Sequence, residues 1–133
     1  MTSCTRFSAG EGRYEVWADV MWMGADLVVL LGGGTKPHVG AVSVAFVHES
    51  LAGGDRVSCT PSLLTLPTHK EYEIALVGAE KLARVLERSV VVIAGIHLDN
   101  ASAGDVVALT QNASGALDQV LIALSHERSS PGT

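Results

Sequence analysis

Three short segments of the chain each place a histidine beside residues that could hold a ligand. Residues 32–38 read Gly-Gly-Gly-Thr-Lys-Pro-His, residues 68–73 read Thr-His-Lys-Glu-Tyr-Glu, and residues 95–100 read Gly-Ile-His-Leu-Asp-Asn. An imidazole can bind a metal ion, exchange a proton near neutral pH, or form hydrogen bonds to an anion or a heterocycle. Brought together in space, the three histidines could therefore hold a phosphorylated cofactor or a metal ion.

The first segment combines glycines with a positive charge and ends at His38. Gly33 and Gly34 have no Cβ, so their backbone amides could approach a ligand closely, and Lys36 could add a charge for a phosphate. The segment lacks the Gly-Lys-Ser/Thr ending of a Walker loop and does not match the dinucleotide-binding fingerprint. The alternative is a flexible connection between two strands, with a turn fixed by Pro37.

The second segment has the features of a helix N-terminus. Thr68 is a candidate N-cap, and Glu71 follows three residues later, as in a capping box. Two side chains that can be positive, His69 and Lys70, would oppose the helix dipole at this end unless an anion were bound there. The segment therefore indicates either a structural cap or an anion site.

The third segment follows a predicted buried strand and precedes the last predicted helix. His97 and Asp99 project to the same side of an extended chain, so the carboxylate could orient the imidazole. Asn100 comes next, in the region beyond a strand's carboxyl end where ligands commonly bind. The alternative is a histidine that Asp99 satisfies structurally. His48 and His126 read as ordinary surface residues.

The residue spacing gives little support to a metal centre or to an independent enzyme. The chain has no His-x-x-x-His pair, no nucleophile elbow and no kinase or hydrolase motif set. Cys4 and Cys59 are far apart, as expected for two reduced thiols. We predict no catalytic residue and no resident metal; the alternative is a small metal-dependent enzyme that uses the three histidines.

Three motifs in this order resemble those of the LpdD-like prenylated-flavin chaperones. They are Gly-Gly-Gly-Thr-Lys-Pro-His-Val-Gly-Ala-Val at 32–42, Leu-Thr-Leu-Pro-Thr-His-Lys-Glu at 64–71 and Ala-Gly-Ile-His-Leu-Asp-Asn-Ala at 94–101. The resemblance covers about residues 14–122, and the third motif is the most specific. The second motif departs from the family pattern Gly-His-Lys-Asp-Asp, because Thr68 precedes the histidine and Glu71-Tyr72 follows the lysine here.

The resemblance implies a non-catalytic accessory protein of the UbiD-type decarboxylases that act on gallate and related hydroxyarylic acids. Such a protein would bind reduced prenylated FMN, or FMN itself, shield it from oxygen, and deliver it to the apo-decarboxylase. The flavin prenyltransferase is a second candidate partner, and a structural decarboxylase subunit that binds nothing small is the alternative function. The expected cofactor-binding residues are Gly33, Gly34, Lys36, His38, His69, Lys70, His97, Asp99 and Asn100.

Composition narrows the class of protein further. The 133 residues suffice for one core, so we predict a single LpdD-like domain over residues 1–128 and a frayed tail over 129–133. A net charge of −5 would repel nucleic acid. The apolar stretches at 26–32 and 90–96 are much shorter than the roughly 18 residues of a membrane span, and residues 1–10 do not read as an export signal. We therefore expect a cytoplasmic protein with no nucleic-acid or membrane partner.

Strand patterns dominate the first half of the chain, from Phe7 onward. Alternating apolar residues over 14–23 and β-forming runs over 26–31 and 39–47 predict strands, the first two joined as a hairpin. The Gly- and Pro-containing stretch 48–67 reads as a long loop with short extended pieces. The valine-rich strands also predict a homodimer through sheet edges or faces.

A helix, a strand and a second helix follow. Apolar residues at three-to-four spacing predict a helix over about 70–87, and the β-branched run 89–96 predicts a central strand covered on both sides. Asn100 or Ser102 would cap the last helix with help from Asp105. The predicted core stripe of that helix is Val106, Leu109, Ala113, Leu117, Val120, Leu121 and Leu124. We predict an α+β fold, a mixed and largely antiparallel sheet with two helices on one face, in the order β-β-β-β-α-β-α.

Overall fold

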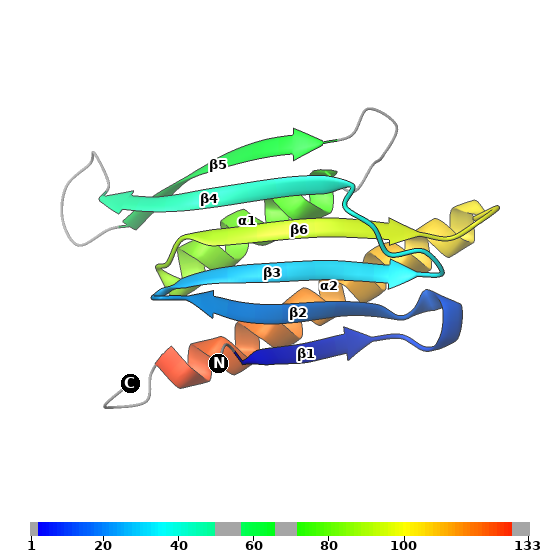
Figure 1. The fold of residues 1–133 in the computed structure, drawn as a ribbon, viewed down its shortest axis with the longest axis horizontal. Helices are drawn as coiled ribbons and strands as arrows, with labels where there is room; N and C mark the ends of the chain where they lie inside the picture. The colour runs from blue at the N-terminus through cyan, green and yellow to red at the C-terminus, as the bar shows by residue number, and fades with distance from the viewer. Residues whose placement is uncertain (1–2, 50–56, 66–71, 129–133) are drawn as a thin grey trace.

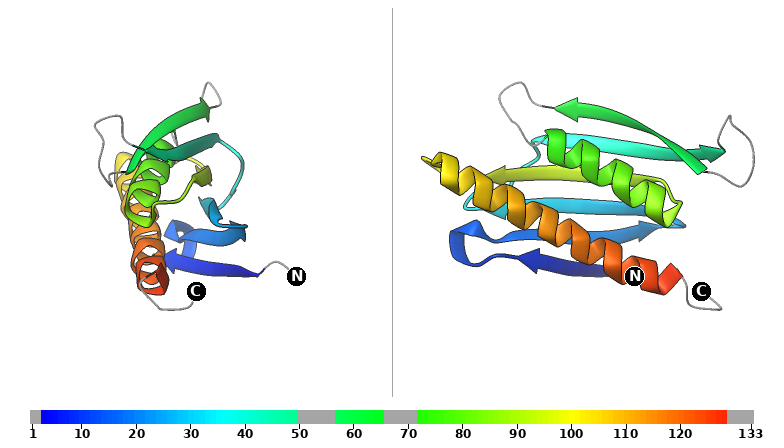
Figure 2. Two further views of the ribbon diagram at one scale, coloured as in Figure 1. Left: turned by 90° about the vertical axis from the view of Figure 1, so that its left-hand side faces the viewer. Right: turned by 180° about the vertical axis from the view of Figure 1, so that it is seen from behind.

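The computed structural model describes residues 3–49, 57–65 and 72–128 of the chain. This part forms a six-stranded sheet with two helices packed on one face, as Figure 1 and Figure 2 show. The strands are β1 Cys4–Ala9, β2 Val16–Met23, β3 Asp26–Gly34, β4 Ala41–Glu49, β5 Val57–Thr65 and β6 Val90–His97; the helices are α1 Tyr72–Leu86 and α2 Ala103–Arg128, with a short 3-10 turn, η1, at Gly12–Tyr14. The predicted α+β class, with both helices on one face, is confirmed.

The order of strands across the sheet differs from their order along the chain. Neighbours follow β1-β2-β3-β6-β4-β5, with β3 and β6 parallel and the other described pairs antiparallel. β6 therefore lies in the middle of the sheet, as its β-branched sequence predicted. The predicted β2–β3 hairpin is also confirmed, since Met23 pairs with Asp26 and Gly24 supplies the positive φ of the turn, +62°.

Two parts of the strand prediction were wrong. Residues 57–65 form one continuous strand, so five strands rather than four precede α1. β5 pairs with β4 along its whole length and lies at the edge of the sheet, where Pro61 is tolerated because one side of the strand needs no N–H donor. β3 also runs through the three glycines to Gly34, a stretch that the sequence assigned to a loop.

The hydrophobic core lies between the helices and one face of the sheet. Alternate strand residues and the inner faces of the helices supply it: Val16, Ala18, Val20, Leu27, Val29, Leu31, Ala41, Ala45, Val90, Val92, Ala94, Ala75, Ala79, Leu82, Ala83, Leu86, Leu109, Ala113, Ala116, Val120 and Leu124. The small alanines of both helices allow close approach to the sheet. Ser43 also lies in this core, and its hydroxyl has no hydrogen-bond partner in the described part of the chain. None of the described helices combines the length and the apolar character needed to cross a membrane.

The start of α2 matches one of the two predicted caps. The Ser102 hydroxyl accepts a hydrogen bond from the Asp105 amide at 3.0 Å, and the Asp105 carboxylate accepts one from the Ser102 amide at 3.0 Å. This reciprocal pair is a capping box, and the phenol of Tyr14 donates a further hydrogen bond to Asp105 at 2.7 Å. The core stripe of α2 was partly wrong, because Val106 is 54% exposed and belongs to the surface of the helix.

Candidate functional site

The parallel strands β3 and β6 end side by side, where Gly34 is paired with His97. From there the segment 35–40 folds across the end of β6 before β4 begins. Backbone hydrogen bonds hold it there, from the amide of Thr35 to the carbonyl of His97 (2.8 Å), from His38 to Gly95 (3.3 Å) and from Gly40 to Ala94 (2.9 Å). The crossing brings residues from the first and the third predicted segments to one end of the sheet.

This crossing depends on a glycine in β6. A Cβ on Gly95 would overlap the carbonyl oxygen of His38, so no side chain fits between the strand and the segment that crosses it. A side chain at Gly95 would point away from the helices, because successive residues of a strand face opposite sides and the neighbouring Ala94 is buried in the core. The crossing segment therefore lies on the face of the sheet opposite the helices.

Two of the three predicted imidazoles meet at this end. The ring centroids of His38 and His97 are 6.2 Å apart, and the rings are nearly perpendicular, at 79°. The side chain of His97 is 41% exposed, so the pair is half-buried and accessible from solvent. His69 and Lys70 lie outside the described residues, and their place in the site stays a prediction.

A carboxylate and an ammonium complete the described cluster. Nε2 of His97 is hydrogen-bonded to Oδ1 of Asp99 at 2.8 Å, and Nζ of Lys36 lies 3.7 Å from Oδ2 of the same carboxylate. The hydrogen bond from His97, followed by the positive charge of Lys36, lowers the pKa of Asp99 below its ordinary value. An ionised Asp99 fixes the orientation of the His97 ring, as the sequence spacing predicted. Nδ1 of His38 is similarly held, 3.1 Å from the Lys36 carbonyl oxygen.

The glycines do not form the amide cradle that the sequence suggested. The amide of Gly34 donates to the carbonyl of Glu15, and the amides of Thr35 and Lys36 both donate to His97. Gly34 has φ of +75°, and a Cβ there would overlap the carbonyl oxygen of His97. These glycines serve close packing of the backbone, so any anion at this end is left with the Lys36 ammonium and the imidazoles.

Gly33 and Asn100 are the remaining predicted site residues that the structure describes. Gly33 is paired with Val16 and Ile96 inside the sheet, and a Cβ on it would lie 2.6 Å from the carbonyl oxygen of Glu15. Asn100 adopts φ of +55° in the turn between β6 and α2, a conformation that asparagine tolerates better than most residues. Contact of either residue with a ligand stays a prediction.

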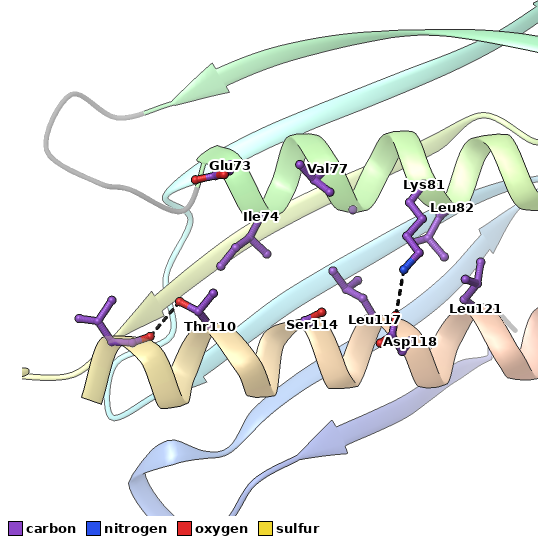
Figure 3. Close-up of a pocket in the computed structure, with 12 residues that line it drawn as sticks. Glu73, Ile74, Val77, Lys81, Leu82, Thr110, Ser114, Leu117, Asp118 and Leu121 are labelled. Carbon is purple, nitrogen blue, oxygen red and sulfur yellow. Dashed lines mark hydrogen bonds and ion pairs between the residues drawn. The ribbon is translucent and has the colours of Figure 1, made fainter. Parts of the chain in front are cut away.

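A groove between the two helices was not predicted (Figure 3). It encloses about 430 Å³, and its lining residues are Glu73, Ile74, Val77, Gly78, Lys81, Leu82, Val106, Thr110, Ser114, Leu117, Asp118 and Leu121. The Lys81–Asp118 ion pair, at 3.2 Å, spans it. Of the predicted ligand residues that the structure describes, none lines this groove, which lies on the helix side of the sheet. The residues that could have indicated the groove are Val77 and Val106, two apolar residues that the structure leaves exposed on the surfaces of the two helices.

The family described as the prenylated flavin chaperone LpdD-like domain matches residues 10–125. This chain belongs to that LpdD-like family. The resemblance carried by the three motifs is thereby confirmed, and family membership gives the chain a chaperone role. The matched residues include all of the described cluster, Lys36, His38, His97 and Asp99.

Two comparisons place this LpdD-like chain among known proteins. It is 26% identical over 107 residues to Protein LpdD of Lactiplantibacillus plantarum, a match that covers 77% of this chain and 71% of that protein. Its fold is similar to that of a chain in a chaperone complex for yeast 20S proteasome assembly, with a TM-score of 0.51, 13% identity, and coverage of 97% and 98% of the two chains. The second likeness concerns the fold alone.

Proposed function

We propose that this LpdD-like chain is a non-catalytic cytoplasmic accessory protein that binds reduced prenylated FMN, protects it from oxygen and delivers it to a UbiD-type decarboxylase. The observation that supports the proposal most strongly is the convergence of His38 and His97, with Lys36 and Asp99, at the carboxyl ends of two parallel strands. Crevices beyond such strand ends are common ligand sites. Membership of the prenylated flavin chaperone family supports the choice of ligand.

The donor set of the cluster fits the polar groups of a flavin nucleotide. Imidazoles can donate to or accept from the carbonyl and N–H edge of an isoalloxazine, and the bond to Asp99 fixes how His97 presents its other ring nitrogen. The Lys36 ammonium, whose side chain is 70% exposed, can reach a phosphate group. When bound, the prenylated flavin is the decarboxylase's redox-sensitive cofactor, whereas the residues of this chain bind and orient it.

The openness of the cluster fits a chaperone that must release its cargo. The side chains of Lys36, His97 and Asp99 are 70%, 41% and 59% exposed, so a ligand would be held by few charged and polar contacts at the surface. Such contacts are weaker than those of an enclosed site, and transfer requires only that the decarboxylase bind the flavin more tightly. No covalent attachment is needed.

Anaerobic titration with reduced prenylated FMN tests the proposal, with binding read from flavin absorbance and protection from the rate of oxidation after air is admitted. We expect saturable binding, slower oxidation in the presence of the chain, and loss of affinity by on the order of 10-fold in His38→Ala and His97→Ala. His126→Ala, which removes an exposed imidazole from the end of α2, is the matched control. Equal oxidation rates with and without the chain would contradict the protective role.

The same samples separate the two alternative functions. A metal enzyme would retain stoichiometric metal after purification and show metal-dependent turnover without affinity for the reduced flavin. Within the described residues no group of three or more His, Cys, Asp and Glu side chains could hold a metal ion. A purely structural subunit would still activate the decarboxylase after His38, His69 and His97 had all been replaced by alanine.

A further inference from the structure

The sheet face opposite the helices is covered with apolar side chains. Strand registers place them in two rows that cross the sheet, Leu30–Ile93–Val42–Leu64 and Met21–Val28–Val91–Val44. Trp17, which is paired with Gly32, and Phe46, which is paired with Thr60, lie on the same face and flank the two rows on opposite sides. We call the ten residues together the open face. Phe46 is 57% and Leu64 76% exposed, and Figure 2 shows both helices on the other side of the sheet.

The middle strand has the sequence of a strand with both faces buried, but the helices cover only one. Val90 and Val92 point to the helices and are fully buried, whereas Val91 and Ile93 point to the open face and remain partly exposed. A continuous apolar run is typical of a strand that is packed on both sides. The open face therefore has the composition of an interior that the described part of a single chain leaves uncovered.

We propose that the open face is covered by the open face of a second copy of this chain, sheet against sheet. Six strands at about 4.8 Å spacing and about eight residues at 3.3 Å each give a face of about 29 by 26 Å, or roughly 750 Å² per chain, of which the segment 35–40 covers the end beside Gly95. The remainder is of the same order as the roughly 800 Å² per partner of a standard stable interface. Two equally twisted sheets can stack about 10 Å apart with their strands inclined by about 30°.

The charges on this face suit contact with an identical face. Arg6 and Asp19 continue the row of Leu30 and satisfy each other through two hydrogen bonds, of 2.7 and 2.8 Å. The guanidinium of Arg6 also lies 4.3 Å from the ring centroid of Trp17. Because this ion pair is internally matched, a two-fold related copy would not bury an unpaired charge there, as a self-complementary interface requires.

Association through the sheet edges is less favourable than association through the face. The edge strand β5 contains Pro61, which supplies no N–H for a neighbouring strand. The opposite edge strand, β1, is only six residues long and carries Arg6. Both features are those by which natural sheets avoid pairing edge to edge.

Sedimentation equilibrium of the full chain, between about 1 and about 200 µM, tests the proposal directly. We expect a species of twice the 13.8 kDa chain mass. Phe46→Asp places a charge on the open face and should weaken dimerisation on the order of 100-fold, as expected when a large aromatic anchor of an interface is replaced by a charge. Ile122→Asp is the matched control, since Ile122 is 61% exposed on α2 and should leave the dimer intact. Far-UV circular dichroism verifies that both variants are folded.

Tryptophan emission gives a second reading of the same contact. In a Trp22→Phe background, the remaining indole is Trp17 on the open face, so dilution through the dimer dissociation range should shift its emission to the red. A wild-type chain that is monomeric at the highest concentration would overturn the proposal. So would a dimer that survives Phe46→Asp, because its interface would lie at an edge or on the helices.

Discussion

Replacing Gly95 by alanine should displace the segment 35–40 from β6, and the candidate site depends on the contact between them. The new Cβ would overlap the carbonyl oxygen of His38, which is backbone and cannot rotate out of the way. The segment must lift from β6, with loss of the hydrogen bonds from the amides of His38 and Gly40. Two backbone hydrogen bonds are worth about 0.5–1.5 kcal/mol each, and overpacking of a filled site costs about 1–3 kcal/mol.

The reduced flexibility of the unfolded Gly95→Ala chain offsets about 0.4–1 kcal/mol of this loss. We therefore expect the free energy of unfolding to fall by about 2–4 kcal/mol, measured by urea titration with tryptophan fluorescence. The affinity for reduced prenylated FMN should fall with it, because His38 no longer lies beside His97. Gly104→Ala is the matched control: its Cβ would meet only the Ser102 hydroxyl oxygen, at 3.7 Å, and should leave stability unchanged or slightly raised.

A loss of less than about 1 kcal/mol in Gly95→Ala would refute the reasoning, since backbone could not then be packed against that position. Flavin affinity that stays intact while stability falls would separate the two parts of the argument. The crossing would then be structural, and the pair of histidines would not form the binding site.

Three other changes give separate tests. Ser43→Ala should raise the free energy of unfolding by about 1 kcal/mol, because it removes a buried hydroxyl that lacks a described partner; a urea titration measures this, and a loss of stability would contradict it. Asp105 has a pKa lowered first by the hydrogen bond from the Ser102 backbone, so its contribution to stability is present above the unfolded-state pKa and is lost as the pH falls through the lower, folded-state pKa. Asp105→Asn should therefore flatten the decline of the urea midpoint below about pH 4, and an unchanged acid limb would contradict that assignment. Lys36→Met should weaken binding of prenylated FMN by on the order of 10-fold but leave prenylated riboflavin, which has no phosphate, unaffected; equal loss for both ligands would exclude a phosphate contact.

Local patterns predicted most elements of the fold, but not the continuous strand β5 or the position of β6 between β3 and β4. The alternation in β2, the turn at Gly24 and the stripes on α1 and α2 depend on neighbouring residues, so sequence periodicity could reveal them. The continuity of β5 through Pro61 depends on its pairing with β4, and the insertion of β6 between β3 and β4 depends on parallel contacts between distant segments. Periodicity has no access to such pairing.

The candidate site was predictable in part, for a similar reason. Placing His97 and Asp99 at the carboxyl end of a central strand required only the strand pattern, and their hydrogen bond was predicted. Whether the amides beside Gly34 are free or already bonded depends on the strands next to them, and here the structure corrected the prediction. The groove was missed because an apolar stripe on a helix normally indicates core, whereas Val77 and Val106 are exposed.

The late position of β6 in the chain has a consequence for synthesis on the ribosome. β3 and β4 both emerge before β6, the strand that separates them. Until β6 is synthesised, the unit β1-β2-β3 and the hairpin β4-β5 therefore each have an edge strand without its final hydrogen-bond partner. At about 5–20 residues per second the interval from residue 49 to residue 97 lasts roughly 2–10 seconds. If β3 paired directly with β4 during that interval, β6 could not insert between them. A chain stalled before residue 90 should accordingly aggregate, and a synthetic β6 peptide supplied during translation should rescue it.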